Sequence, residues 1–133
     1  MYYHMVVDEV ERDALDDVFH ALADRTRRDI VVRTLQAEYS VSALSRLYPM
    51  TFAAVQKHVA VLERAALVTK RRSGREQLVT GNVDTVRRAA RLLDRLELIW
   101  RARMDRFGEL LAEDLAPPAP GPAHDGPGSG GPA

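Results

Sequence analysis

The last third of the chain has the pattern of one long amphipathic helix, whose apolar face a small protein must bury. From Asp84 to about Leu115 there is no proline and no glycine before Gly108. At about 1.5 Å per residue, one helix of this length extends about 45 Å. Its apolar stripe consists of Val86, Ala89, Leu92, Leu93, Leu96, Ile99, Trp100, Met104, Phe107, Leu110 and Leu111. A 133-residue chain is too small to cover this stripe alone, so we expect it to pack against the first helix and also against a second copy.

Composition excludes several classes of protein. The chain has no cysteine, which excludes disulfides, thiolate metal ligands and cysteine nucleophiles. It has no apolar run of about 18 residues, so we expect no membrane span. The N-terminus is polar and acidic, unlike a signal peptide. We therefore expect a cytoplasmic protein.

Three regions follow from composition along the chain. Residues 1–12 form an N-terminal extension that leads into the first helix, and residues 13–115 form one domain. Residues 116–133 are rich in proline, glycine and alanine and cannot offset their own ordering entropy, so they are predicted to be a disordered tail.

Charge is unevenly distributed although the net charge is zero. Residues 1–23 carry a net charge of −5, residues 24–91 a net charge of +8 and residues 92–133 a net charge of −3. A basic block between acidic flanks suggests a polyanionic partner. The alternative is that these arginines are ordinary solvated surface residues.

Helical patterns and capping residues divide the basic block. A first helix is predicted over 8–23, with Leu15, Val18, Phe19 and Leu22 on one face. Asp24 is predicted to cap a second helix that ends near Gln36. The residues of this second helix expected inside are Ile30, Val31 and Leu35.

Two shorter helices are predicted next. Ser42 is expected to cap a third helix with Leu44 and Leu47 inward, and Pro49 to end it. Thr51 is expected to cap a fourth helix after about three residues of turn. Two helices so joined form a helix-turn-helix.

A β-hairpin is predicted over residues 68–80, with Ser73 and Gly74 at its turn. Its basic residues cluster around the turn. A hairpin that follows a helix-turn-helix is called a wing. The expected fold is therefore mostly α with a small β-hairpin: a winged helix-turn-helix with a long C-terminal dimerisation helix.

Three segments in order, FHALADRTRRDIV, SVSALSRL and TFAAVQKHVAVLERAALVTKRRSGRE, resemble the ArsR/SmtB family of winged-helix regulators. The resemblance covers about residues 13–105. It implies a homodimer that binds double-stranded DNA at a palindromic operator, usually repressing its own promoter. The chain departs from the family pattern at Arg25, where proline is usual, and at Ala66, where glycine is usual. If position 66 is left-handed, alanine costs about 1 kcal/mol there; we expect the helix end to be adjusted instead.

The fourth helix, residues 51–65, is the predicted recognition helix. Val55, Val59 and Leu62 are expected to face the core, while its polar face enters the major groove. Gln56 can bond an adenine edge, and Lys57 can meet guanine or phosphate. His58 either contacts DNA or supports the helix. The candidate DNA-binding residues of this helix are Thr51, Phe52, Ala53, Gln56, Lys57 and His58. For Gln56 and Lys57 the alternative is that they are plain surface residues.

Backbone or minor-groove contacts are predicted for the wing residues Lys70, Arg71, Arg72 and Arg75, together with Ser42. Ser42 could equally act only as a helix cap. For Arg27 and Arg28 we favour intramolecular salt bridges that fix the second helix.

No metal site or cofactor is expected. The four histidines, at positions 4, 20, 58 and 124, show no ligand spacing, and residues 84–115 contain none. A small-molecule effector could sit between the first and last helices near Trp100, although Trp100 is favoured as dimer core. The predicted dimer interface consists of Leu15, Phe19, Leu93, Leu96, Trp100 and Phe107.

Enzymatic activity is not expected, because the sequence has no glycine-rich phosphate loop, no nucleophile with a matched base and no metal cluster. The alternative to a DNA-binding regulator is a winged-helix module that binds protein through the long helix.

Overall fold

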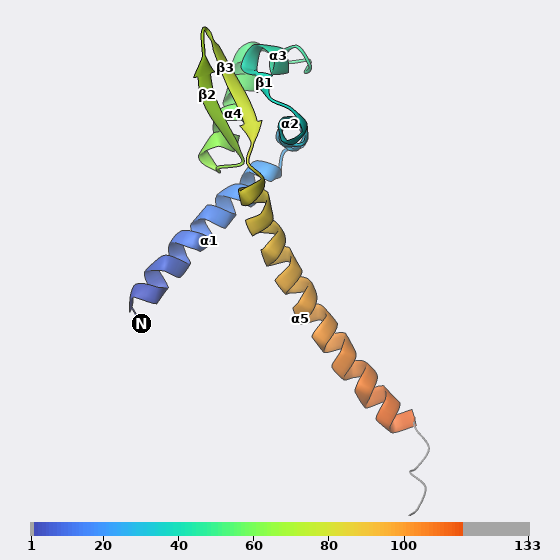
Figure 1. Cartoon of the computed structure of the whole chain (residues 1–133). Coiled ribbons are helices and arrows are strands. Elements are labelled where there is room, and N and C mark those ends of the chain that lie inside the picture. Colours follow the sequence, from blue (N-terminus) through green and yellow to red (C-terminus); the bar gives the residue numbers. More distant parts are fainter. Residues whose placement is uncertain (1, 116–133) are drawn as a thin grey trace, which may run out of the picture. The chain divides into compact units, whose positions relative to one another are not determined.

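Within residues 2–115, which the computed structural model describes, the chain forms five helices and three strands (Figure 1). The elements are α1 (Tyr2–Leu22), α2 (Arg25–Gln36), β1 (Tyr39–Ser40), α3 (Val41–Ser45), α4 (Phe52–Arg64), β2 (Val68–Ser73), β3 (Glu76–Gly81) and α5 (Val83–Leu115). The predicted winged helix-turn-helix with a long C-terminal helix is confirmed. The chain divides into two compact units, residues 1–95 and 96–133. The predicted tail, 116–133, lies outside the described residues.

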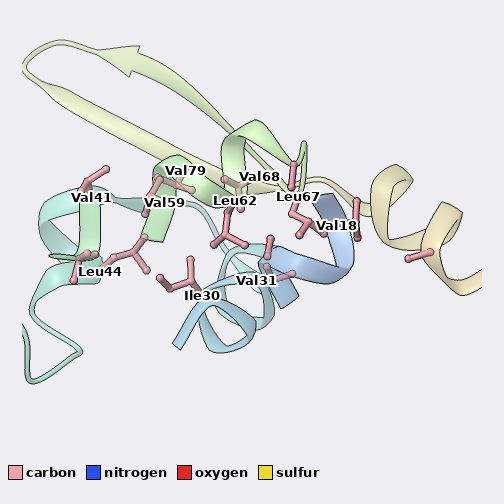
Figure 2. Close-up of a cluster of buried hydrophobic side chains, with 14 residues drawn as sticks. Val18, Ile30, Val31, Val41, Leu44, Val59, Leu62, Leu67, Val68 and Val79 are labelled. Atoms are coloured by element: carbon pink, nitrogen blue, oxygen red, sulfur yellow. The ribbon is translucent and has the colours of Figure 1, made fainter. Parts of the chain in front are cut away.

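The core of the first unit gathers apolar side chains from the helices and the hairpin (Figure 2). Ile30, Leu44 and Val79 come from α2, α3 and β3, and each is fully buried. The α4 residues expected to face this core are confirmed there: Val55, Val59 and Leu62. Truncating such a side chain to alanine typically costs about 2 to 5 kcal/mol, so this packing fixes which face of α4 points outward.

Two of the three predicted helix caps are confirmed. The Asp24 carboxylate accepts a hydrogen bond from the Arg27 amide at 2.9 Å, and the Thr51 hydroxyl accepts one from the Ala54 amide at 3.1 Å. The Ser42 cap is wrong, because Ser40 accepts the bond from the Ala43 amide at 3.0 Å. Ser40 ends the extended segment β1 and has the backbone conformation that a cap needs, which leaves Ser42 exposed on the helix.

Two residues expected inside the core are exposed instead. Leu35 is 42% exposed, because the neighbouring Thr34 is the buried residue one turn after Ile30. The Thr34 hydroxyl donates a hydrogen bond to the Ile30 carbonyl. Leu47 is also exposed, because α3 ends at Ser45 and Leu47 lies in the turn that follows. The helix thus ends before Pro49, and the turn spans 46–51 rather than three residues.

The ends of the two longest helices also differ from prediction. α1 begins at Tyr2, six residues before the predicted start, and ends one residue before the predicted end. α5 begins at Val83, one residue early. Neither shift changes which residues of the first unit reach the core.

The hairpin is part of a three-stranded antiparallel sheet in the order β1-β3-β2. The two-residue β1 pairs through Tyr39 with Val79 and was not predicted, because a two-residue strand has no periodicity to detect. Ser73 pairs with Glu76, so the turn consists of Gly74 and Arg75, one residue later than predicted. Gly74 has a φ of 63°, which glycine adopts without strain.

The turn between α3 and α4 is fastened to α2. The Tyr48 hydroxyl donates to the Asp29 carboxylate at 2.6 Å, and Arg33 Nε donates to the same oxygen at 2.8 Å. These two bonds hold the pKa of Asp29 below its ordinary value, the Tyr48 bond contributing most. Burial and the Asp29 bond raise the pKa of Tyr48 to about 12.

The turn that follows α4 contains a residue in the left-handed conformation that is not glycine. Ala66 has a φ of 61°, so the expectation that the helix end would be adjusted is wrong. The Leu67 amide donates to the Leu62 carbonyl and the Ala66 amide to the Glu63 carbonyl, both at 2.9 Å, which is a Schellman ending. The Ala66 carbonyl in turn accepts a bond from the buried Thr85 hydroxyl at 2.6 Å, so the same turn anchors the start of α5.

We expect Ala66→Gly to raise the free energy of unfolding by about 0.5 to 1 kcal/mol, because glycine adopts a positive φ without the Cβ penalty. Urea unfolding measures the change. Ala65→Gly is the matched control: its φ is −82°, so it gains no such relief and should lose about 0.5 to 1 kcal/mol. A loss of stability in both variants would contradict this interpretation of position 66.

We expect Asp29→Asn to reduce the pH dependence of stability in acid. Because the folded-state pKa of Asp29 lies below the ordinary 3.8, its contribution is present above that value and is lost as the pH falls through the lower folded-state pKa. Urea unfolding from about pH 6 to about pH 2.5 would show a shallower acid decline in the variant. Asp13→Asn, at an exposed acid of α1, is the control, and an equal flattening there would contradict the prediction.

Candidate nucleic-acid interface

The outer face of α4 carries Phe52 together with polar and small side chains, and the opposite face is buried in the core. The residues predicted to point outward are all exposed: Thr51, Phe52, Ala53, Gln56 and Lys57. Thr51 caps the helix, and the others occupy its first turns. This end of a recognition helix is the one that reaches base edges in helix-turn-helix proteins.

A hollow of about 270 Å³ lies between α3, α4 and the wing. It is lined by five of the residues proposed from sequence: Ser42, Phe52, Gln56, Lys70 and Arg75. Residues separated by up to 33 positions along the chain therefore share one concave surface. Gln77 also lines it and was not singled out from the sequence, because an isolated glutamine on a strand gives no signal.

Two of the four wing bases already have acidic partners. Lys70 Nζ lies 3.3 Å from a Glu63 carboxylate oxygen. Arg71 donates through Nη2 and Nε to the two oxygens of Glu38, at 2.9 and 3.2 Å. Arg71, together with a bond from Thr80, holds the pKa of Glu38 below its ordinary value. Neither acid was predicted from the sequence as a partner of a wing base. Glu38 lies 33 residues from Arg71, too far for a local pattern to reveal the pair.

The other wing bases have no carboxylate partner. Arg72 Nε donates only to the Gly74 carbonyl, at 3.4 Å. Among the described side chains, Arg72, Arg75 and Lys57 form no ion pair within 4 Å. Exposed ion pairs are worth about 0 to 1 kcal/mol, so even the Arg71 pair can be exchanged for another anion at small cost.

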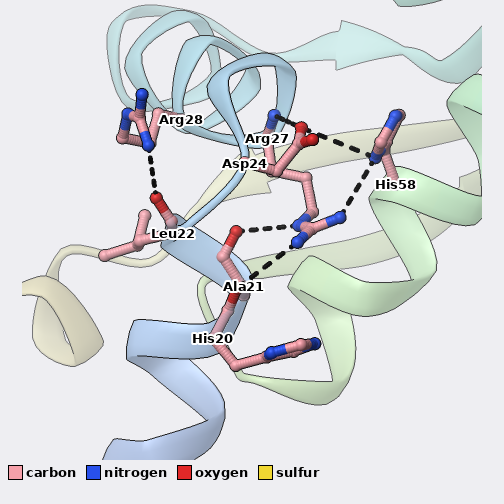
Figure 3. A network of polar contacts seen from close by, with 7 residues as sticks. All are labelled: His20, Ala21, Leu22, Asp24, Arg27, Arg28 and His58. Carbon is pink, nitrogen blue, oxygen red and sulfur yellow. Dashed lines mark hydrogen bonds and ion pairs between the residues drawn. The ribbon is translucent and has the colours of Figure 1, made fainter.

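Behind this surface, Arg27 joins three helices (Figure 3). Its Nε donates to the Ala21 carbonyl at 2.8 Å and its Nη2 to the His20 carbonyl at 3.3 Å, while Nη1 lies 3.4 Å from His58 Nδ1. Arg28 Nη1 donates to the Leu22 carbonyl at 2.8 Å. Both arginines act within the chain, as favoured, but the predicted salt bridges are wrong: the partners are mainly the last carbonyls of α1, which a helix leaves unsatisfied.

His58 belongs to the same junction. It is half-buried, and its Nδ1 lies 3.9 Å from an Asp24 carboxylate oxygen. The pKa of Asp24 is lowered, first by the Arg27 amide bond and also by the charges of His58 and Arg27. This placement matches the supporting role that the sequence left open for His58, and a base contact by His58 stays a prediction.

The six predicted interface residues have different environments. Leu15 and Phe19 of α1 are half-buried, and Phe19 packs against the core. The four on α5 are exposed: Leu93, Leu96, Trp100 and Phe107. At 3.6 residues per turn these four lie within an arc of about 60° around α5.

Among the side chains that the structure describes, there is no group of three or more acidic or histidine residues that could hold a metal ion. No helix among the described residues is long and apolar enough to span a membrane. The cavity between α1 and α5 is lined by the early turns of α5 up to Arg95, not by Trp100.

Known proteins resemble this chain both in sequence and in fold. No protein-family model matches the chain. It is 33% identical over 96 residues to the HTH-type transcriptional regulator Rv2034 of Mycobacterium tuberculosis. The aligned region covers 72% of this chain and 87% of that protein. An ArsR-like transcriptional regulator from Rhodococcus sp. RHA1 superimposes with a TM-score of 0.67 at 29% identity, over 74% of this chain and 93% of the other.

A third similar structure is the homodimeric winged helix-turn-helix DNA-binding domain of Mb0332 from Mycobacterium bovis, a possible ArsR-family regulator. Its TM-score is 0.54 at 26% identity, over 64% of this chain and 80% of that domain. Sequence, fold and exposed helix face agree with one another. The chain therefore belongs to the ArsR family of winged helix-turn-helix transcriptional regulators.

Proposed function

We propose that this regulator is a homodimeric repressor that reads a palindromic operator, including one at its own promoter. α4 enters the major groove, and the tip of the β2–β3 wing contacts the phosphate backbone or the minor groove. No catalytic step is assigned to the chain. Because the proposed target is chromosomal DNA, its place of action is the bacterial cytoplasm.

The observation that carries this proposal is the exposed polar face of α4 beside a concave, basic wing. Gln56 is exposed and lines the hollow, where its amide can bond an adenine edge with two hydrogen bonds. Lys57 is exposed beside it and can meet phosphate or guanine. Thr51, Phe52 and Ala53 complete the surface that would approach the bases.

The electrostatics of the wing support a division of roles between its bases. Arg72 and Arg75 stand at the tip with no carboxylate partner among the described residues, and are assigned to phosphates. Lys70 and Arg71 first have to leave Glu63 and Glu38. Because such exposed pairs are weak, these two bases contribute smaller net gains to DNA affinity.

We expect Gln56→Ala to cost about 1 to 3 kcal/mol on the operator and little on random DNA, because a bidentate base contact carries discrimination of that size. Arg75→Ala should weaken binding to both DNAs alike and reduce the slope of log affinity against log salt by about 1, through one lost phosphate contact. Fluorescence anisotropy on the gene's own upstream DNA and on random duplex, across salt, measures both effects.

Arg87→Ala is the control for these variants, since Arg87 lies on α5 outside the lining of the hollow and pairs with Asp84. Equal losses on both DNAs from both changes would refute the division of roles. If the unchanged chain bound neither DNA at low salt, the alternative of a protein-binding winged-helix module would be preferred.

We expect the double change Leu96→Glu with Phe107→Glu to convert the dimer into a monomer in sedimentation velocity, because it puts two charges into the proposed apolar interface. Affinity for a palindromic operator should fall by about 100-fold, since the second half-site contact is no longer intramolecular. Ala102→Glu, on the opposite side of α5, should leave the dimer intact. A dimer that survives the double change would place the interface elsewhere.

A further inference from the structure

A second concave site lies at the other end of α4, away from the proposed DNA surface. It is a cavity of about 290 Å³ between α1, the C-terminal end of α4 and the first turns of α5. Arg64, which lines it, is eight residues after Gln56, or about 12 Å along the helix. This cavity is therefore not part of the surface assigned to DNA.

The cavity has an excess of positive charge. Among the side chains that the structure describes, four arginines and two carboxylates line it, the carboxylates being those of Glu11 and Asp17. The arginines are Arg64, Arg88, Arg91 and Arg95. None of them lies within 4 Å of a carboxylate oxygen among the described side chains. Clustered guanidinium groups repel one another, and a bound anion would relieve that repulsion.

The remaining walls are aliphatic. Ala14, Leu15 and Val18 of α1 face Ala65 and Ala66 at the end of α4. A purely inorganic anion would leave these walls without apolar contact, whereas an uncharged hydrocarbon would leave the arginines unneutralised. The cavity volume of about 290 Å³ is near the lower limit for small-molecule sites, which favours a small ligand.

We propose that this cavity binds a small amphipathic carboxylate, with its carboxylate on the arginines and its hydrocarbon part against the aliphatic walls. Guanidinium groups suit this role because they bind carboxylates through two parallel hydrogen bonds. Arg88 is also held in place, since its Nη2 lies 3.2 Å from the buried Thr85 hydroxyl. The site is independent of whether the chain binds DNA.

Calorimetric titration of the full chain with octanoate tests this proposal, and 1-octanol is the uncharged control ligand. We expect saturable octanoate binding, with octanol at least about tenfold weaker because it lacks the charge-assisted bonds. Arg91→Gln and Arg64→Gln should each weaken octanoate binding about tenfold or more. Ala14→Phe should weaken it by filling the cavity while leaving every arginine in place.

Arg87→Gln is the matched control: it removes one charge from the same helix outside the cavity and should change octanoate affinity less than about twofold. Absence of saturable binding, equal binding of octanol, or equal effects of Arg87→Gln and Arg91→Gln would each overturn the proposal. If octanoate does not bind and Ala14→Phe turns a dimer into a monomer in sedimentation, a second copy of the chain fills this cavity instead.

Discussion

The burial of one face of α4 is the constraint from which the other features of the first unit follow. Val55, Val59 and Leu62 are packed among residues from α2, α3 and the wing, so the rotation of α4 about its own axis is set by the core. The polar side chains between them then have only the solvent side available. The buried residues and the proposed DNA-reading residues thus lie on opposite faces of one short helix.

Polar contacts fix the two ends of this helix where packing alone would not. At its start, the Tyr48–Asp29 bond ties the preceding turn to α2. At its end, the left-handed Ala66 turns the chain into the wing and accepts the bond that anchors α5. Near its middle, His58 meets the Arg27 junction. Each of these contacts joins α4 to a different neighbouring segment, so small changes in any of them would alter how the exposed face is presented.

The acidic residues moderate the basic character of the wing. Glu38 and Glu63 engage two of its four bases, whereas the tip arginines form no ion pair with any side chain that the structure describes. A surface arranged in this way concentrates positive charge where the hairpin projects. The arginines around the cavity form a second cationic group at the C-terminal end of α4.

The sequence by itself determined the helical order, the Asp24 and Thr51 caps, the core face of α4 and the family, because periodicity and capping are local and the matching segments are long. It was wrong for Ser42, Leu35 and Leu47, where competing residues a position or two away were equally plausible locally. Only the tertiary structure decided that Ser40 caps α3, that position 66 is left-handed despite being alanine, and that Arg27 caps α1. The same holds for the Glu38–Arg71 pair and the arginine-lined cavity. The Glu38–Arg71 pair and the cavity depend on contacts between residues far apart in the chain, about which local propensity carries no information. Ser40, Ala66 and Arg27 bond within a few residues, where the local pattern allowed more than one outcome and the surrounding packing decided between them.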